Sequence, residues 1–371
     1  MTPPSLTPAP LSPAPTPAQR RGRPLEHRGR LQSLTSGAGL LALSLTVTLG
    51  LVACGSGSPS GGSGDEEATS AGAEGGSGAE DLTRIRVGAI PIGDVAPIHV
   101  GVREGFFEEE GLDVEVVNTS GGAIAVPGVV AGDYDFAFGN TVSLMVARDQ
   151  GLPLQYVANG TTTTGEEGKD FAAVIALEDS ELETSADLQG QTASSNNLMN
   201  IGDTSIRLAV DNAGGDGADM DFIELAFGDA AAAVQNGQVE AALVLEPYLT
   251  QSLDAGLKAV SWPYAEAHPD LDIGGYFTTE EVIEQRPEDV EAFTRAMRTS
   301  MEYSQENPDV VREVIGEYTE TDPEILERIT LPRFKADFSR EAMTTLGEAA
   351  VKYGVIDEAP DLDALLPEGT A

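Results

Sequence analysis

The chain has 371 residues, with 61 acidic against 21 basic side chains and a formal charge of −40. So negative a surface excludes nucleic acid as an expected partner, because binding to phosphates requires basic side chains. The single cysteine excludes a fold held together by disulfides, but the chain is long enough to bury the core of one large α/β unit or of two lobes.

The first 53 residues are typical of an export signal behind a proline-rich leader. Residues 1–19 are rich in proline, and five arginines precede the uncharged, apolar run 37–53. A basic segment followed by an apolar core and small residues indicates a signal peptide that is removed. The end of the run, LVAC at 51–54, resembles the bacterial lipobox, which implies lipidation at Cys54. The alternative is a signal anchor in which the cysteine is incidental.

A segment of glycine, serine and acidic residues follows the cysteine at 55–80. It has no large apolar residue, so we expect it to behave as a flexible tether between a membrane surface and the folded body. Without residues 1–53, which hold five Arg and one Glu, the chain has 16 basic and 60 acidic residues.

Strand and helix patterns alternate along the first part of the body. Segments rich in β-branched and aromatic residues are separated by helical segments of about 10–15 residues, which favours parallel βαβ units. The expected strands are 84–90, 112–117, 134–139 and 153–160, and the expected helices are 97–107, 122–132 and 141–151.

The apolar run 171–178 is long enough to cross from one lobe to another, and a second alternating series follows it. That series predicts strands at 190–195, 221–227 and 239–247 and helices at 203–215 and 228–237. Asp229 is expected to cap the last of these helices and Gly237 to end it. From Thr278, where Thr278 and Glu281 form a candidate capping box, the pattern is helical to the end of the chain.

The segment GVREGFFEEEGLDVEVV at 101–117 resembles one family of bacterial solute-binding proteins. Segments 131–157, 196–215, 233–256 and 274–279 extend the resemblance in family order over nearly all of 84–365. The family serves ABC importers for nitrate, taurine, alkanesulfonates and pyrimidine precursors of thiamine. The resemblance implies an α/β, two-lobed periplasmic-binding-protein fold, similar to type II, in which each lobe is a βαβ sheet with helices on both faces and a hinge joins the lobes.

The domain prediction follows from these segments. It comprises a leader and lipoprotein signal peptide at 1–53, a flexible tether at 54–80, a first lobe at 81–175, a second lobe at 176–271 and a return to the first lobe at 272–371.

The loops that follow the predicted strands hold the candidate ligand-binding residues, because ligands bind at the carboxyl ends of strands in open α/β sheets. Their backbone and side-chain donors suit a small polar ligand. The alternative role for each residue is that of a helix cap or turn, as for Asp203. The candidates are Pro91, Ile92, Gly93, Asp94, Ser120, Gly121, Gly122, Gly139, Asn140, Thr141, Asn196, Asn197, Asn200, Gly202, Asp203, Thr204 and Glu246.

The sequence departs from the family pattern at Leu245, where the family often has tryptophan before the Glu-Pro pair. Stacking on a planar ligand is therefore assigned to Tyr248 or Tyr276. The candidate loops hold no lysine or arginine, which favours a neutral or cationic heterocycle over nitrate or a sulfonate, unless helix N-termini or Arg207 hold an anion.

We expect capture of a small solute outside the membrane and its delivery to an ABC permease with its ATPase, by a monomer that is lipid-anchored to the outer face of the cell membrane. No metal or cofactor is expected, because the two histidines of the body are far apart in sequence. One alternative is a ligand-sensing lobe for a membrane receptor. The other is an enzyme similar to thiamine-pyrimidine synthases, which the absence of cysteine from the body disfavours.

Overall fold

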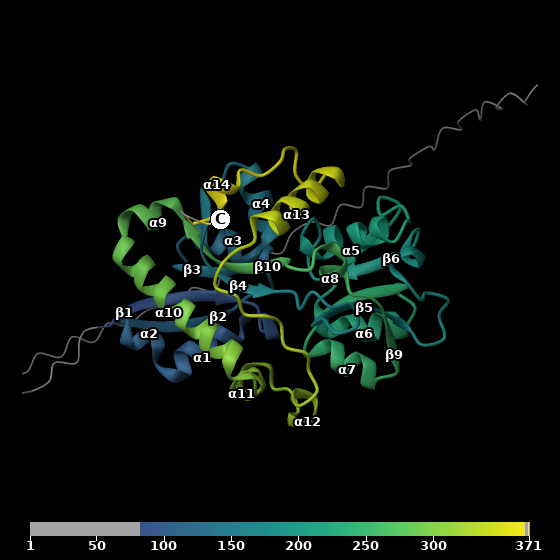
Figure 1. Cartoon of the computed structure of the whole chain (residues 1–371), viewed down its shortest axis with the longest axis horizontal. Coiled ribbons are helices and arrows are strands. Elements are labelled where there is room, and N and C mark those ends of the chain that lie inside the picture. Colours follow the sequence, from purple (N-terminus) through teal and green to yellow (C-terminus); the bar gives the residue numbers. More distant parts are fainter. Residues whose placement is uncertain (1–81, 368–369, 371) are drawn as a thin grey trace, which may run out of the picture. The chain divides into compact units, whose positions relative to one another are not determined.

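The computed structural model describes residues 82–367 and residue 370, and its elements are shown in Figure 1. The predicted signal peptide, Cys54 and the tether lie outside the described residues. Within the described part of the chain, no helix is long and apolar enough to cross a membrane.

The first sheet has five strands in the order β2-β1-β3-β10-β4. Strands β1, β2 and β3 are parallel, whereas β10 runs antiparallel to both of its neighbours. The strands are β1 (Thr83–Ala89), β2 (Leu112–Asn118), β3 (Phe136–Asn140), β4 (Leu154–Thr162) and β10 (Asp272–Thr279).

Helices cover both faces of the first sheet. Successive side chains of a strand point to opposite faces, so neighbouring residues pack into different cores. On β10, Tyr276 packs into the core beside α1 (Ala96–Glu104), α10 (Pro287–Glu306) and α11 (Pro308–Thr319). Its neighbour Phe277 packs into the opposite core, beside α4 and α13. The helices of that face are α3 (Gly122–Val130), α4 (Thr141–Asp149), α13 (Arg340–Lys352) and α14 (Leu362–Leu365).

The second sheet has the order β7-β6-β8-β5-β9 and the same alternation. On β8, Leu243 faces the core with α5 and α8, and Val244 faces the core with α6 and α7. The strands are β5 (Ala172–Leu177), β6 (Thr192–Ser195), β7 (Asp221–Glu224), β8 (Ala241–Leu245) and β9 (Leu257–Ser261), and the helices are α5 (Ile201–Asn212), α6 (Phe227–Gln235), α7 (Tyr248–Asp254) and α8 (Pro263–Ala267).

The remaining elements are short. They are η1 (Gly93–Val95), α2 (Phe106–Glu109), η2 (Ser185–Leu188), α9 (Glu280–Gln285) and α12 (Pro323–Leu326).

The α/β fold with two sheets is confirmed, but several local predictions were wrong. The sheets are mixed, because β5 and β10 are antiparallel to their neighbours. The run 171–178 forms β5 entirely within the second sheet, so the chain crosses between sheets before it. The expected helix 97–107 is two helices, because Gly105 has a φ of 84°. The lobe boundaries at 175/176 and 271/272 stay a prediction.

Two predicted helix caps were also wrong. Asp229 lies inside the first turn of α6, whose N-cap is Ala226. Thr279 caps α9 by accepting a hydrogen bond from the Val282 amide, while the Thr278 hydroxyl donates to the Asp135 carbonyl. The predicted end of α6 at Gly237, with a φ of 65°, is confirmed.

Candidate functional site

Loops from both sheets meet around two adjoining cavities at the carboxyl ends of the parallel strands. The inner pocket has a volume of about 30 Å³ and the outer cavity about 350 Å³. They share Ile90, Ile92, Asn196 and Phe227 in their walls. These positions follow β1, β6 and β7, so the cavities lie at the edge where the fold class predicts a ligand.

Eleven of the predicted ligand-binding residues line one or both cavities. They come from the loops after β1, β2, β3, β6 and β8. They are Pro91, Ile92, Asp94, Ser120, Gly121, Gly122, Gly139, Asn140, Asn196, Asn197 and Tyr248.

The loop after β2 approaches the loop after β6 closely at Gly121. Its φ is 120°, and a Cβ built on it would lie 2.6 Å from Oδ1 of Asn197 and 3.0 Å from Nδ2 of Asn196. Any larger residue would be strained and would push the two asparagines away. Glycine at this position therefore keeps the cavity walls together.

The predicted residues near the start of α5 have structural partners. Asn200 caps α5 and forms a capping box with Asp203, whose carboxylate accepts from the amides of Met199, Asn200 and Thr204. Gly202 leaves no room for a Cβ, which would lie 2.2 Å from Oγ of Ser195. These contacts agree with the alternative that this segment is a helix cap, and its ligand-binding role stays a prediction.

Glu246 also uses its carboxylate within the protein. It is 3% exposed and accepts from the amide and hydroxyl of Thr250, at 3.0 and 2.9 Å, and from the amide of Thr330 at 3.2 Å. Its carbonyl accepts from the amide of Gly93 at 3.1 Å. Glu246 therefore ties the end of β8 to two segments that belong with the first sheet.

Thr141 and Tyr276 lie away from the two cavity walls. The Thr141 hydroxyl donates to the carbonyl of Asp272 at 2.8 Å. The ring of Tyr276 packs edge-on against Phe138 and Phe293 in the core of the first sheet. Of the two tyrosines proposed for stacking, Tyr248 is the one that lines the outer cavity.

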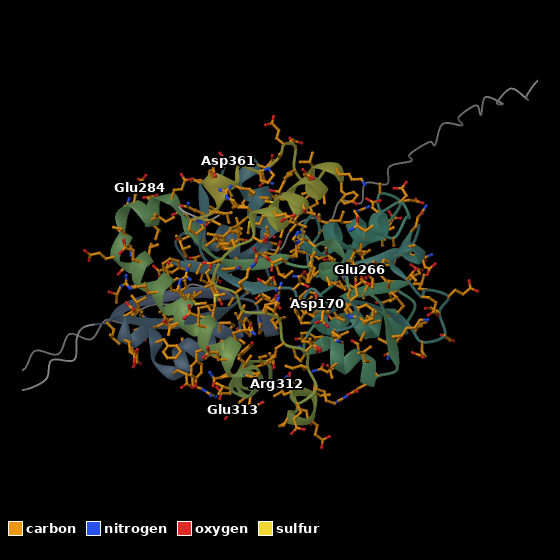
Figure 2. All side chains as sticks on the ribbon, viewed as in Figure 1. Asp170, Glu266, Glu284, Arg312, Glu313 and Asp361 are labelled. Carbon is orange, nitrogen blue, oxygen red and sulfur yellow. The ribbon has the colours of Figure 1, made fainter. Side chains whose placement is uncertain are left out.

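Asp94 is the charged side chain in the wall of the inner pocket. It is 1% exposed, and neither carboxylate oxygen has a hydrogen-bond partner on another described residue. Burial raises the pKa of Asp94 to about 8, with its own backbone amide opposing the rise and the nearby Asp170 carboxylate adding to it. Asp170, which is labelled in Figure 2, is also buried.

Aromatic rings that the sequence interpretation missed complete the inner pocket. Phe138, Phe227 and Tyr264 line it together with the aliphatic side chains of Ile201, Leu245 and Ile273. Phe138 and Phe227 adjoin strand ends that the sequence had identified, so the end of each apolar run was an available signal. Tyr264 lies on α8, whose return to the pocket depends on tertiary packing.

Three cations that lie near the candidate loops in sequence are held elsewhere. The guanidinium of Arg207 donates to the carbonyls of Gly217, Ala218 and Met220. Arg148 pairs with Glu280 at 3.0 Å and Lys169 with Glu166 at 2.9 Å. No lysine or arginine is among the described residues that line the two cavities.

The family model described as "NMT1/THI5 like" matches residues 93–310. A curated relative, the formylaminopyrimidine-binding protein of Halalkalibacterium halodurans, is 25% identical over 224 residues, which are 59% of this chain and 64% of that protein.

Two solved structures share the fold. The alkanesulfonate-binding protein SsuA from Xanthomonas axonopodis pv. citri, bound to MOPS, has a TM-score of 0.63 and 14% identity over 78% of this chain and 99% of that one. The periplasmic nitrate-binding protein NrtA from Synechocystis PCC 6803 has a TM-score of 0.65 and 16% identity over 78% of this chain and 88% of that one.

Proposed function

Because the chain belongs to the NMT1/THI5-like family and is the solute-binding component of an ABC import system, we propose that it captures a small polar solute between its two lobes and delivers it to a membrane permease. The observation that carries the proposal is the pair of adjoining cavities walled by loops from both sheets. A volume of about 350 Å³ falls within the usual range for small-molecule sites, about 300–1,000 Å³.

Hinge closure around the solute is the mechanism that this arrangement supports. The chain passes between the sheets from β4 to β5 and again from β9 to β10, which gives two connections that can bend together. Asn196 and Asn197, after β6, lie against the loop after β2. A solute bound between these loops contacts both lobes and therefore favours the closed form.

We favour a neutral or cationic nitrogen heterocycle over nitrate or a sulfonate as the solute. The cavity walls have no described lysine or arginine, whereas a buried anion is normally held by charge-assisted hydrogen bonds. The curated relative named for formylaminopyrimidine agrees with this choice. The two solved structures named for alkanesulfonate and nitrate share the fold at 14% and 16% identity. At such low identity a shared fold does not assign a ligand to this chain.

The proposed position of the protein is the outer face of the cell membrane. Cys54 would carry the lipid, and 54–80 would let the folded body reach a permease. At least two acyl chains give stable anchoring, since each buried methylene contributes about 0.8 kcal/mol.

The test combines solute binding with uptake. We expect one or more of aminopyrimidines, riboflavin, taurine, alkanesulfonates, nitrate and amino acids to raise the melting temperature of the full chain, since a ligand at 100 times its Kd stabilises the folded state by about 2.7 kcal/mol. The same solute should stimulate ATP hydrolysis by the cognate permease and ATPase in liposomes. In cells, Cys54→Ser should lose uptake while the purified variant keeps binding.

Two outcomes would contradict the proposal. A bound solute that neither stimulates the permease nor enters the cell would favour the ligand-sensing alternative. If Cys54→Ser keeps both uptake and membrane retention, the proposal of a lipid anchor at Cys54 is wrong.

A further inference from the structure

We propose that the transported solute carries a protonated amino or amidino group and that the Asp94 carboxylate binds this group in the inner pocket. The inference rests on the proposed solute-binding function and assigns to Asp94 the selection of cationic solutes. The carboxylate lines the pocket, is 1% exposed and has no hydrogen-bond partner on another described residue.

Burial makes the ionised form of Asp94 costly, so the group is largely protonated at pH 7 in the absence of a solute, and a positive charge beside it is needed to favour ionisation. The ionisable groups coupled to it are the Asp170 carboxylate and the neutral phenols of Tyr264, Tyr276 and Tyr318, whose pKa values are raised by burial and further by the Asp94 charge. His99, whose ring stacks on Tyr318 at 4.0 Å, has its pKa lowered to about 4 by burial and is neutral at pH 7. None of these groups supplies a positive charge, so a ligand is the available source.

The two volumes define the size of the group and of the rest of the solute. About 30 Å³ holds one water-sized group, which matches a single amino nitrogen. The adjoining 350 Å³ holds the body of the solute, with Tyr248, Asn196 and Asn197 in its wall. Ile92 and Phe227 line both cavities, so the cavities adjoin there and a single solute can occupy both.

The aromatic wall increases the selectivity for a cation. Phe138, Phe227 and Tyr264 give the inner pocket an apolar wall, and charges attract more strongly where the dielectric is low. The faces of such rings also attract ammonium groups. A hydroxyl of the same size would leave the Asp94 charge unbalanced.

The test uses pairs of solutes that differ by one group. Taurine is paired with isethionate, and 4-amino-5-(aminomethyl)-2-methylpyrimidine with its 5-(hydroxymethyl) analogue. We measure the affinities by calorimetric titration of the full chain at pH 8.5. In at least one pair, the amine should bind at least about tenfold more tightly than the hydroxyl compound. Between pH 6 and 8 the affinity for this amine should rise by up to about tenfold per pH unit, because the ionised carboxylate is the form that binds it.

Asp94→Asn keeps the shape of the side chain and removes its charge. We expect this variant to lose the preference for the amine to within about threefold, and to lose the rise in affinity with pH. Asp94→Ala, checked for folding by circular dichroism, provides a second loss of charge. Asp361→Asn is the matched control, because Asp361 is an exposed N-cap on α14 and asparagine caps equally well.

The inference is overturned if neither amine binds, if the hydroxyl compounds bind as tightly, or if Asp94→Asn keeps the preference. Binding of isethionate or nitrate that still stimulates the permease would overturn the role of Asp94 and leave the import function intact. Failure of every bound solute to stimulate the permease would instead count against the import function.

Discussion

At the scale of single residues, the ionisation of Asp94 opposes folding of the unliganded protein. Its pKa is about 8 in the fold against 3.8 in the unfolded chain, because burial disfavours the charged form. The folded state therefore binds the extra proton between these values, so the contribution of Asp94 to stability is fully present below about pH 4 and is lost as the pH rises through 8. Substitution of Asp94 isolates this contribution.

We expect Asp94→Asn to stabilise the unliganded chain at pH 9 by on the order of 3 kcal/mol relative to wild type, and by much less at pH 5. Urea denaturation at both pH values measures the difference. A purely structural Asp94 would give destabilisation at both. Gain of stability together with loss of amine binding would identify a residue kept for function at a cost to the fold.

The sequence predicted the cavity residues that follow strands, including Asp94, because the position of a loop after an apolar strand is a local property. It did not predict which loop residues turn inward. Asp203 and Glu246 are acidic residues in equivalent places, yet their carboxylates accept protein hydrogen bonds. Only the packed structure separates them from Asp94, and Tyr264 enters the pocket through a helix whose position depends on tertiary contacts.

At the scale of elements, Glu246 joins the start of α7 to the segment at Thr330. All three of its carboxylate contacts come from donors. In Glu246→Gln an NH2 group replaces one carboxylate oxygen. This group donates and cannot accept, so at least one buried donor loses its acceptor. We expect a loss of about 1–3 kcal/mol in the free energy of unfolding, measured by urea denaturation.

Glu327→Gln is the control for that loss, because Glu327 is exposed on the segment that follows α12. It should change stability by less than about 0.5 kcal/mol. Equal effects of the two variants would show that the buried contacts of Glu246 contribute little.

Most strands and helices were predictable because alternation and capping are encoded within each segment. Ser339, for example, is a serine that caps α13 by accepting a hydrogen bond from the Ala342 amide, and Gly354 follows the end of that helix with a φ of 70°. The direction of β5 and β10 was not predictable in this way. An antiparallel ladder is set by partners such as Leu243 against Val174, which lie far apart in sequence.

At the scale of the whole folded body, side-chain contacts far from the cavities connect the helices of the two sheets. Arg328, just after α12, binds both oxygens of Asp254 at the end of α7. Asp211 on α5 accepts from Lys352 and Tyr353 at the end of α13. Because α12 packs with the first sheet and α7 with the second, the Arg328–Asp254 pair joins elements of the two sheets, and in the proposed hinge closure it would stabilise the closed form.

Arg328→Ala should therefore speed solute release without affecting the cavity walls. Both side chains of the pair are about half exposed, at 50% and 42%, so solvent screens their attraction. We therefore expect a modest increase in the dissociation rate of the solute. The single tryptophan, Trp262, precedes the helix that carries Tyr264 and provides a fluorescence signal for stopped-flow measurement.

The matched control is Arg84→Ala, because Arg84 pairs with Glu115 at 2.9 Å on the neighbouring strand of one sheet. It removes an exposed ion pair without loosening any contact between lobes, so its release rate should equal that of wild type. If Arg328→Ala releases solute no faster than Arg84→Ala, the closed arrangement is held by the cavity contacts and by the shared apolar core, and the salt bridge is incidental to closure.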